Sequence, residues 1–147
     1  MTQPAVNKHF AALPMWLKII AFALPLLSVI FVFGPVIVVL GGIYAKHYGL
    51  SLTSIAAVIL AAKTFDAITD PLIGYYSDRW RMRTGSRKAF MLVGALFLVP
   101  CSYFLFLPSA EVSVAYFAAW YFAFFLAFTL FTIPYFSWIN EFTVDTK

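Results

Sequence analysis

Long apolar segments alternate with short polar ones along this chain. A membrane-spanning helix needs about 20 predominantly apolar residues. The pattern predicts an N-terminal segment outside the membrane, residues 1–15, followed by spans at 16–44, 52–76, 90–107 and 112–139. Because backbone polar groups in hydrocarbon must find their partners within the chain, we expect helices in these spans and not strands. The expected fold is an all-α membrane protein with four transmembrane helices.

The composition fits a membrane protein. Hydrophobic residues make up 63% of the 147 residues and charged residues only 11%, against about 25% charged residues in a soluble domain. The net charge of +4 does not indicate a nucleic-acid partner, because half of the basic residues cluster between two spans, where they set topology. These residues are Arg79, Arg81, Arg83, Arg87 and Lys88. We expect a multi-pass protein of a bacterial-type inner or plasma membrane, with the lipid bilayer as partner and the N-terminus in the cytoplasm.

The span 52–76 contains charged residues at hydrocarbon depth. At about 100° per helical residue, Asp66 lies about 60° and Asp70 about 20° from Lys63, so the three residues share one helical face. Ionisable groups inside a membrane are costly and usually functional. A structural ion pair between Lys63 and Asp66 accounts for one carboxylate and leaves Asp70 without a partner. We therefore favour a functional site over a purely structural pair.

The span 112–139 carries two further patterns. One face is aromatic and is expected either to pack against other helices or lipid or to line a cavity; it contains Phe117, Tyr121, Phe124, Phe128, Phe131 and Tyr135. Another face carries Ala119, Ala123 and Ala127, whose small side chains permit close approach of a second helix.

No nucleophile–base arrangement, nucleotide-binding glycine loop or metal-ligand spacing is visible, so an enzyme is not expected. The single cysteine, Cys101, lies in an apolar run and is interpreted as a packing residue.

The segment KTFDAITDPLIGYYSDRWRMRTGSRKAF, residues 63–90, resembles the glycoside–pentoside–hexuronide:cation symporter family of the major facilitator superfamily. The family pattern there is a basic residue, then D-A-x-x-D-P-x-x-G, then a basic loop. Two other stretches, residues 48–51 and 133–141, are also similar to the family. The resemblance covers nearly the whole chain from Trp16 onward.

The resemblance implies a cation site. In melibiose-type symporters the two aspartates of this motif coordinate the coupling cation, and they match Asp66 and Asp70. Thr69 and Thr129 match further ligand positions, although the Thr129 hydroxyl is equally expected to bond its own helix backbone. Lys63 matches the basic residue and is expected to tune the aspartates electrostatically. The coupling ion is Na⁺, which prefers oxygen ligands, or H⁺; no cofactor and no other metal are expected.

The chain departs from the family at the positions that bind the sugar. The two carboxylates that bind galactoside in melibiose permease fall at Ile30 and Thr132, and a neighbouring tryptophan position is Phe136. These three residues are candidates for lining a substrate cavity. Galactoside transport is not implied, although a sugar or related small solute remains the expected substrate class.

The loop after the second span resembles the superfamily's conserved motif between its second and third helices. Gly74 is expected to permit close packing, and Asp78 with the arginines is expected to form pairs that hold one conformation. The matching residues are Gly74, Asp78, Arg79, Gly85, Arg87 and Lys88.

The family fold has twelve helices in two halves, built from inverted three-helix repeats. The four spans here correspond to its first four helices. The expected function is that of an N-terminal fragment of a cation-coupled secondary transporter working by alternating access. Eight further helices are expected as partners, and the 147 residues are not expected to transport alone. The alternative is a four-helix membrane subunit that acts in assembly or interaction without transport of its own.

Overall fold

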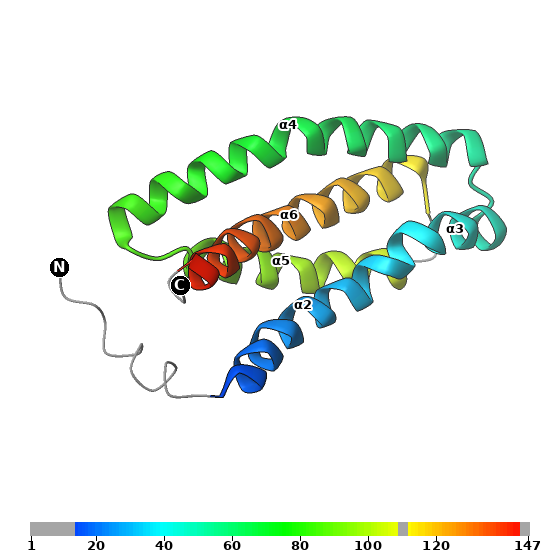
Figure 1. Ribbon diagram of the computed structural model, residues 1–147. Helices are drawn as coiled ribbons and strands as arrows, with labels where there is room; N and C mark the ends of the chain where they lie inside the picture. The colour runs from blue at the N-terminus through cyan, green and yellow to red at the C-terminus, as the bar shows by residue number, and fades with distance from the viewer. Residues whose placement is uncertain (1–13, 109–111, 145–147) are drawn as a thin grey trace. The chain divides into compact units, whose positions relative to one another are not determined.

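The computed structural model describes residues 14–108 and 112–144, and every regular element in them is a helix. The helices are α2 (Met15–Val38), α3 (Leu40–Tyr48), α4 (Leu52–Thr84), α5 (Lys88–Phe106) and α6 (Val114–Val144) (Figure 1). Within the described residues, four helical stretches are long and apolar enough to cross a membrane: Ile19–Val38, Leu52–Thr84, Lys88–Phe106 and Val114–Trp138. The predicted all-α membrane fold is confirmed. Most of the predicted cytoplasmic N-terminal segment, residues 1–15, lies outside the described residues.

The chain divides into two compact units, residues 1–35 and 36–147. The first unit holds most of α2, an apolar helix with Pro25 and Pro35 inside it. The second unit holds α3 to α6 and every candidate site residue except Ile30. The geometry described below therefore belongs to the second unit.

The helix bounds differ from the predicted spans at two places. The predicted span 16–44 is divided between α2 and α3, which meet at Val39. The helix α4 does not end near Tyr76 but continues to Thr84, so Arg79, Arg81 and Arg83 are helical and not part of a loop.

Local capping explains the extent of α4. Its N-cap residue, Ser51, accepts a hydrogen bond from the Ser54 amide at 3.1 Å, which satisfies a backbone donor in the first turn. At the other end Gly85 adopts the left-handed conformation with φ 73°, and its N–H donates to the Arg81 carbonyl. Two arginines in the last turn add a favourable interaction with the helix dipole. The helix ends at this glycine cap and not where the apolar run stops.

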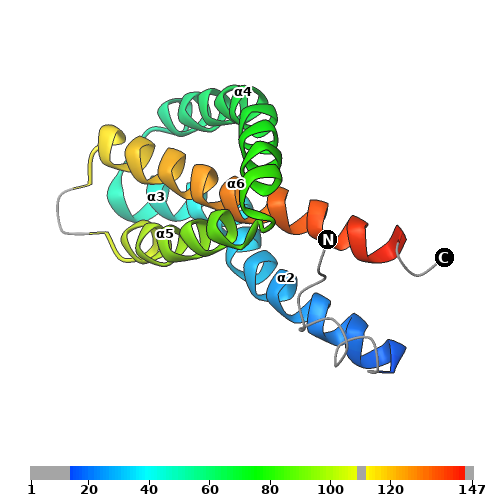
Figure 2. The same cartoon turned by 90° about the vertical axis from the view of Figure 1, so that its left-hand side faces the viewer.

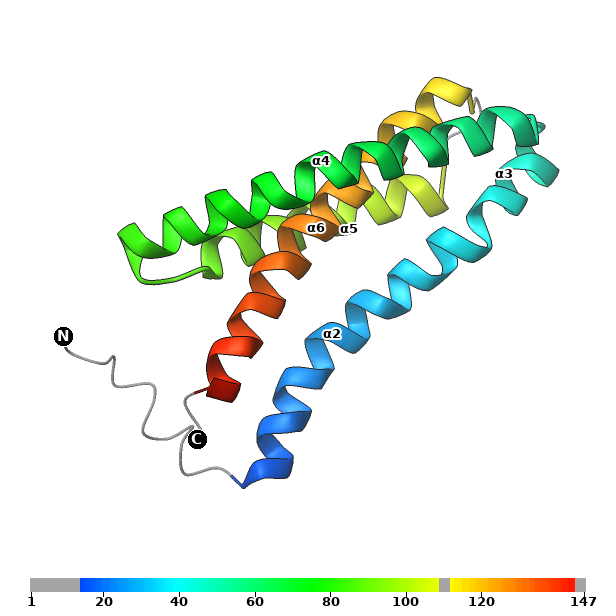
Figure 3. The same ribbon diagram turned by 45° about the horizontal axis from the view of Figure 1, so that its top comes forward.

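Within the second unit α4 and α5 each pack along α6 (Figures 2 and 3). The helices α5 and α6 approach closely at Gly94 of α5, where a methyl group would stand 3.0 Å from the Ala127 carbonyl oxygen of α6. Ala127 is buried, whereas Ala119 is exposed. The small-residue row of α6 thus admits a close neighbour at Ala127 and not along its full length.

The aromatic face of α6 is packed inside the molecule. Five of its six predicted members are buried: Phe117, Tyr121, Phe124, Phe131 and Tyr135. The Phe117 ring lies 4.6 Å from that of Tyr44 on α3, and the Tyr44 hydroxyl donates to the Leu105 carbonyl of α5 at 2.8 Å. The structure therefore favours packing over a cavity for this face.

Candidate functional site

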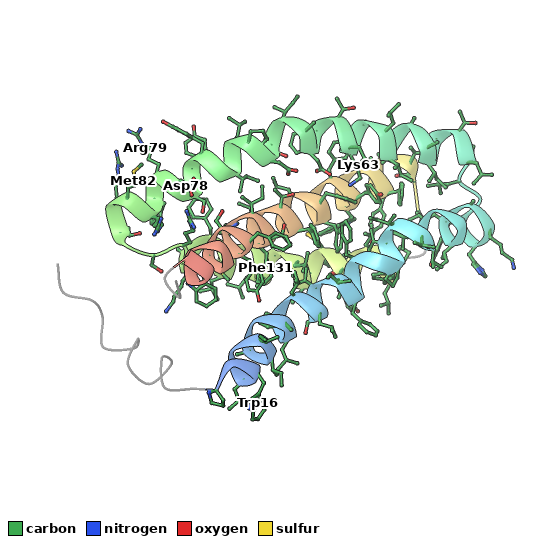
Figure 4. All side chains as sticks on the ribbon, in the orientation of Figure 1. Trp16, Lys63, Asp78, Arg79, Met82 and Phe131 are labelled. Atoms are coloured by element: carbon green, nitrogen blue, oxygen red, sulfur yellow. The ribbon has the colours of Figure 1, made fainter. Side chains whose placement is uncertain are left out.

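Lys63 and Asp66 form an ion pair on one face of α4. The Lys63 ammonium nitrogen lies 3.2 Å from Oδ2 of Asp66, one helical turn further along. Its side chain is on the side of α4 that faces α6 (Figure 4). The Lys63 side chain is 47% exposed and that of Asp66 only 13%. The ion pair that the spacing allowed is present, and the carboxylate is its more buried member.

Each of the two aspartates retains an unsatisfied oxygen. Oδ1 of Asp66 and Oδ1 of Asp70 are buried, and neither accepts a hydrogen bond from the described residues. Buried polar atoms normally have a partner, and an unsatisfied one costs about 1–3 kcal/mol or more when charged. Two such oxygens on one helical face are suited to receive a cation or a proton.

The helix α6 lies beside the carboxylates and carries two of the three candidate threonines, Thr129 and Thr132. The Lys63 ammonium lies 3.8 Å from the centre of the Phe125 ring, and a methyl on Gly74 would meet Ile133 at 3.7 Å. Asp66 and Asp70 lie between Lys63 and Gly74 along α4, just as Thr129 and Thr132 lie between Phe125 and Ile133 along α6. These two contacts place the threonines at the level of the aspartates.

The threonine hydroxyls near the aspartates can serve as oxygen ligands. Thr69 donates to the Phe65 carbonyl at 3.1 Å, and Thr132 donates to the Phe128 carbonyl at 2.9 Å. Since a hydroxyl that donates one hydrogen bond still has lone pairs, these bonds do not prevent the oxygens from binding a cation. Thr129 is buried at 5% exposure.

The candidate cavity residues differ in their exposure. Thr132 is buried and Phe136, one turn later on α6, is 50% exposed. Ile30 is exposed and belongs to the other unit. A hollow of about 400 Å³ in the second unit is lined by other residues, among them Lys88, Leu92 and Phe131.

The basic motif joins the end of α4 to the start of α5. Arg87, the N-cap residue of α5, pairs with Asp78 of α4 through its guanidinium. The Arg87 side chain is 8% exposed and that of Asp78 is 59% exposed. Arg79 donates to the Tyr75 hydroxyl at 3.2 Å, and Lys88 is exposed at the start of α5. Asp78 and Arg79 are seen together at this end of α4 in Figure 4.

The two glycines of this motif, Gly74 and Gly85, differ in their structural roles. Gly85 adopts the positive φ that ends α4, a conformation that L-residues disfavour. A methyl on Gly74 would meet Ile133 at an ordinary van der Waals distance of 3.7 Å. The packing seen here therefore does not require glycine at position 74, in contrast to the close approach expected from the sequence.

Comparison with known proteins assigns the chain to a family. Residues 19–147 match the family model described as MFS/sugar transport protein. The chain belongs to this family. It is a family of transporters and not of enzymes, and the resemblance noted in residues 63–90 to the glycoside–pentoside–hexuronide:cation symporters is confirmed.

Curated relatives within the major facilitator superfamily are similar to this chain over only part of their own length. YagG of Escherichia coli, named for glycoside/cation symport, is 32% identical over 120 residues, which are 80% of this chain and 26% of YagG. The inner membrane symporter YicJ of the same organism is 32% identical over 95 residues, 63% of this chain and 21% of YicJ. An uncharacterized symporter of Synechocystis is 44% identical over 48 residues, 33% of this chain and 9% of the relative. The chain thus spans about a quarter of the first of these relatives. No solved structure matches it significantly.

The sequence did not single out Phe125 beside this family's aspartate motif. The ring of Phe125 lies under the Lys63 ammonium, although the residue is outside the aromatic face defined above. The helical spacing offered a signal, since Phe125 precedes Thr129 by four residues and so shares its face.

The described residues contain no group of three or more His, Cys, Asp or Glu that would hold a metal ion.

Proposed function

We propose that this chain supplies the cation-binding helices of a secondary transporter. That transporter moves a sugar or related small solute together with Na⁺ or H⁺ by alternating access. The observation that carries the proposal is the pair of buried, unsatisfied carboxylate oxygens on Asp66 and Asp70. The family supports transport, and the names of YagG and YicJ favour symport with a cation across an inner membrane.

The charge of the site favours a monovalent ion. Two carboxylates and one ammonium sum to −2 + 1 = −1, so a single Na⁺ or H⁺ brings the group Lys63, Asp66 and Asp70 to neutrality. A neutral group is much less costly than a charged one in hydrocarbon. Sodium would take its oxygens from the two carboxylates and from Thr69 and Thr129, because hard cations prefer several oxygen ligands. A proton would instead relieve the repulsion between two like charges.

The resemblance to the symporter family supports the rest of the proposal. The solute site is formed with eight further helices, because alternating access needs two opposed halves. Ile30, Thr132 and Phe136 occupy the positions of sugar-binding residues but carry no carboxylate, so galactoside is not the proposed solute. The basic cluster supports a cytoplasmic position for the N-terminus and for the turn between α4 and α5.

Protection of the carboxylates from a hydrophobic carbodiimide tests cation binding without requiring transport. The purified chain in lipid nanodiscs is treated with the reagent at increasing Na⁺, with choline holding the ionic strength constant, and modified carboxylates are located by mass spectrometry. We expect saturable protection of Asp66 and Asp70 by Na⁺ at fixed pH or, for a proton site, modification whose dependence on pH differs from that of Asp78. Asp78, which is exposed, is the internal control and should show no Na⁺-specific protection. Modification of Asp66 and Asp70 that Na⁺ does not reduce, and that follows pH as the modification of Asp78 does, would overturn the proposal.

A further inference from the structure

The ammonium of Lys63 contacts both a carboxylate and an aromatic ring. It lies 3.2 Å from Oδ2 of Asp66 on its own helix and 3.8 Å from the ring centre of Phe125 on α6. A cation within about 6 Å of a ring centre is attracted to the negative face of the ring. The position that lets Lys63 reach the carboxylate is therefore the position that the ring favours.

The Phe125 ring is held in place by other rings. It is 2% exposed, and it packs at 4.8 Å from the Tyr121 ring and 5.8 Å from the Phe124 ring. Lys63, in contrast, has a long flexible side chain that is about half exposed. Such a side chain can extend towards a membrane surface and loses rotamer entropy when it is fixed. A rigid ring beneath the ammonium selects one rotamer, the one that lies on Asp66.

We propose that Phe125 is a positioning residue that holds Lys63 on Asp66, where the ammonium competes with the coupling cation for the carboxylate. The inference rests on the proposed cation site and adds a residue that sets its affinity. The ammonium engages one oxygen of the Asp66 carboxylate, and its charge repels an incoming cation. Weakening the ring's hold on Lys63 therefore strengthens cation binding.

Substitutions at position 125 test this through the Na⁺ concentration that gives half-maximal protection of Asp66 from the carbodiimide. In Phe125→Leu we expect that concentration to fall by about three- to tenfold, as loss of a partly desolvated cation–π contact implies. Replacing Phe125 by its 4-fluoro, 3,5-difluoro and 3,4,5-trifluoro analogues keeps the shape of the ring. Each added fluorine weakens the negative electrostatic potential on the face of the ring. The half-protection concentration should fall step by step along that series.

Two controls separate positioning from packing. Phe131→Leu removes an equally large buried ring from α6, at a residue that stacks on Tyr135, and should leave the half-protection concentration unchanged. In a Lys63→Met background, the Phe125 substitutions should have no further effect, because the ammonium that the ring holds is gone.

The outcomes distinguish this inference from the function on which it rests. Saturable Na⁺ protection with the same midpoint across the fluorinated series, or an equal Phe125→Leu effect without Lys63, overturns the role of Phe125 and leaves the cation site standing. If Na⁺ protects neither carboxylate in the unsubstituted chain, the sodium form of the proposed function fails, and this inference fails with it. The fluorinated series decides the question even if Phe125→Leu does not fold.

Discussion

Gly94 of α5 lies so close to Phe131 of α6 that a methyl on its Cα would stand 2.6 Å from the Phe131 backbone nitrogen. The next nearest atoms, the Leu130 carbonyl carbon and the Ala127 carbonyl oxygen, also belong to the backbone of α6. Backbone cannot rotate away as a side chain can. In a bilayer, helices associate chiefly through close packing, since lipid is as apolar as the side chains. The α5–α6 contact therefore depends on glycine at this position.

Gly94→Ala should destabilise the second unit by about 1–3 kcal/mol, the usual cost of overpacking. The free energy of unfolding in bicelles, followed by circular dichroism, measures the effect. Gly42→Ala is the matched control, because a methyl there would meet nothing within 4 Å. Equal stability of the Gly94→Ala chain and the unsubstituted chain would contradict the close approach.

Asp66→Asn and Asp70→Asn should abolish cation-dependent solute accumulation in a protein that carries this sequence with its remaining helices. Each removes a charged ligand, and we expect a loss of at least about tenfold in cation affinity. Lys63→Ala should shift the cation dependence more mildly, because it removes a neighbouring charge and not a ligand. Uptake into cells or vesicles measures the effect, with immunoblots of the membrane fraction to show that insertion survives. Wild-type coupling in the double mutant would falsify the assignment.

Arg87→Ala should destabilise the chain more than Asp78→Asn does. The Arg87 side chain is 8% exposed, so its loss removes packing as well as a pair, by about 1–3 kcal/mol. Asp78 is mostly exposed, and solvent screening keeps its contribution below about 1 kcal/mol. Arg83→Ala, at an exposed position on α4, should change stability by no more than about 0.5 kcal/mol. The same bicelle unfolding measurement ranks the three variants, and a reversed order would show that the pair is not the anchor of this turn.

Single cysteines at Ser86 and Ser109 test the topology in a Cys101→Ala background. A cysteine at Ser86, in the turn between α4 and α5, should react only with reagents that reach the cytoplasm, because the basic residues cluster there. A cysteine at Ser109 should react only with reagents added from outside. Cys101 is buried at 3% exposure, and removing it leaves a clean background. Labelling with the opposite sidedness would overturn the cytoplasmic N-terminus.

Local spacing predicted much of the site. Lys63, Asp66 and Asp70 share a face because a helix places residues three and four apart together, and the Lys63–Asp66 pair follows from that geometry alone. The partner ring of Phe125 was not predicted, because it depends on how α4 and α6 align along their lengths. That alignment is a long-range property that no local pattern specifies.

The extent of α4 shows why composition misplaces helix ends. The predicted span stopped at Tyr76, where apolar residues give way to charged ones, but a helix ends where its backbone is capped. Arginine and methionine favour helix, and Gly85 supplies the cap. That glycine was visible in the sequence and was interpreted only as a motif residue. The break between α2 and α3 at Val39 had no comparably clear signal.

The 33 residues of α4 make a rod of about 50 Å, well over the hydrocarbon thickness of about 30 Å. Its length therefore does not fix its depth in the bilayer. Exposed aromatic side chains at Tyr75, Tyr76 and Trp80 prefer the headgroup layer and anchor this end of the rod. Asp70 precedes Tyr75 by little more than one turn, which is about 7 Å. When the thickness of the bilayer changes, the distance between the Asp66 and Asp70 carboxylates and this interface stays the same. Their distance from the midplane changes. The depth of Asp66 and Asp70 is thus set relative to one surface of the membrane. A change in bilayer thickness alters the surroundings of the other end of α4, near Leu52.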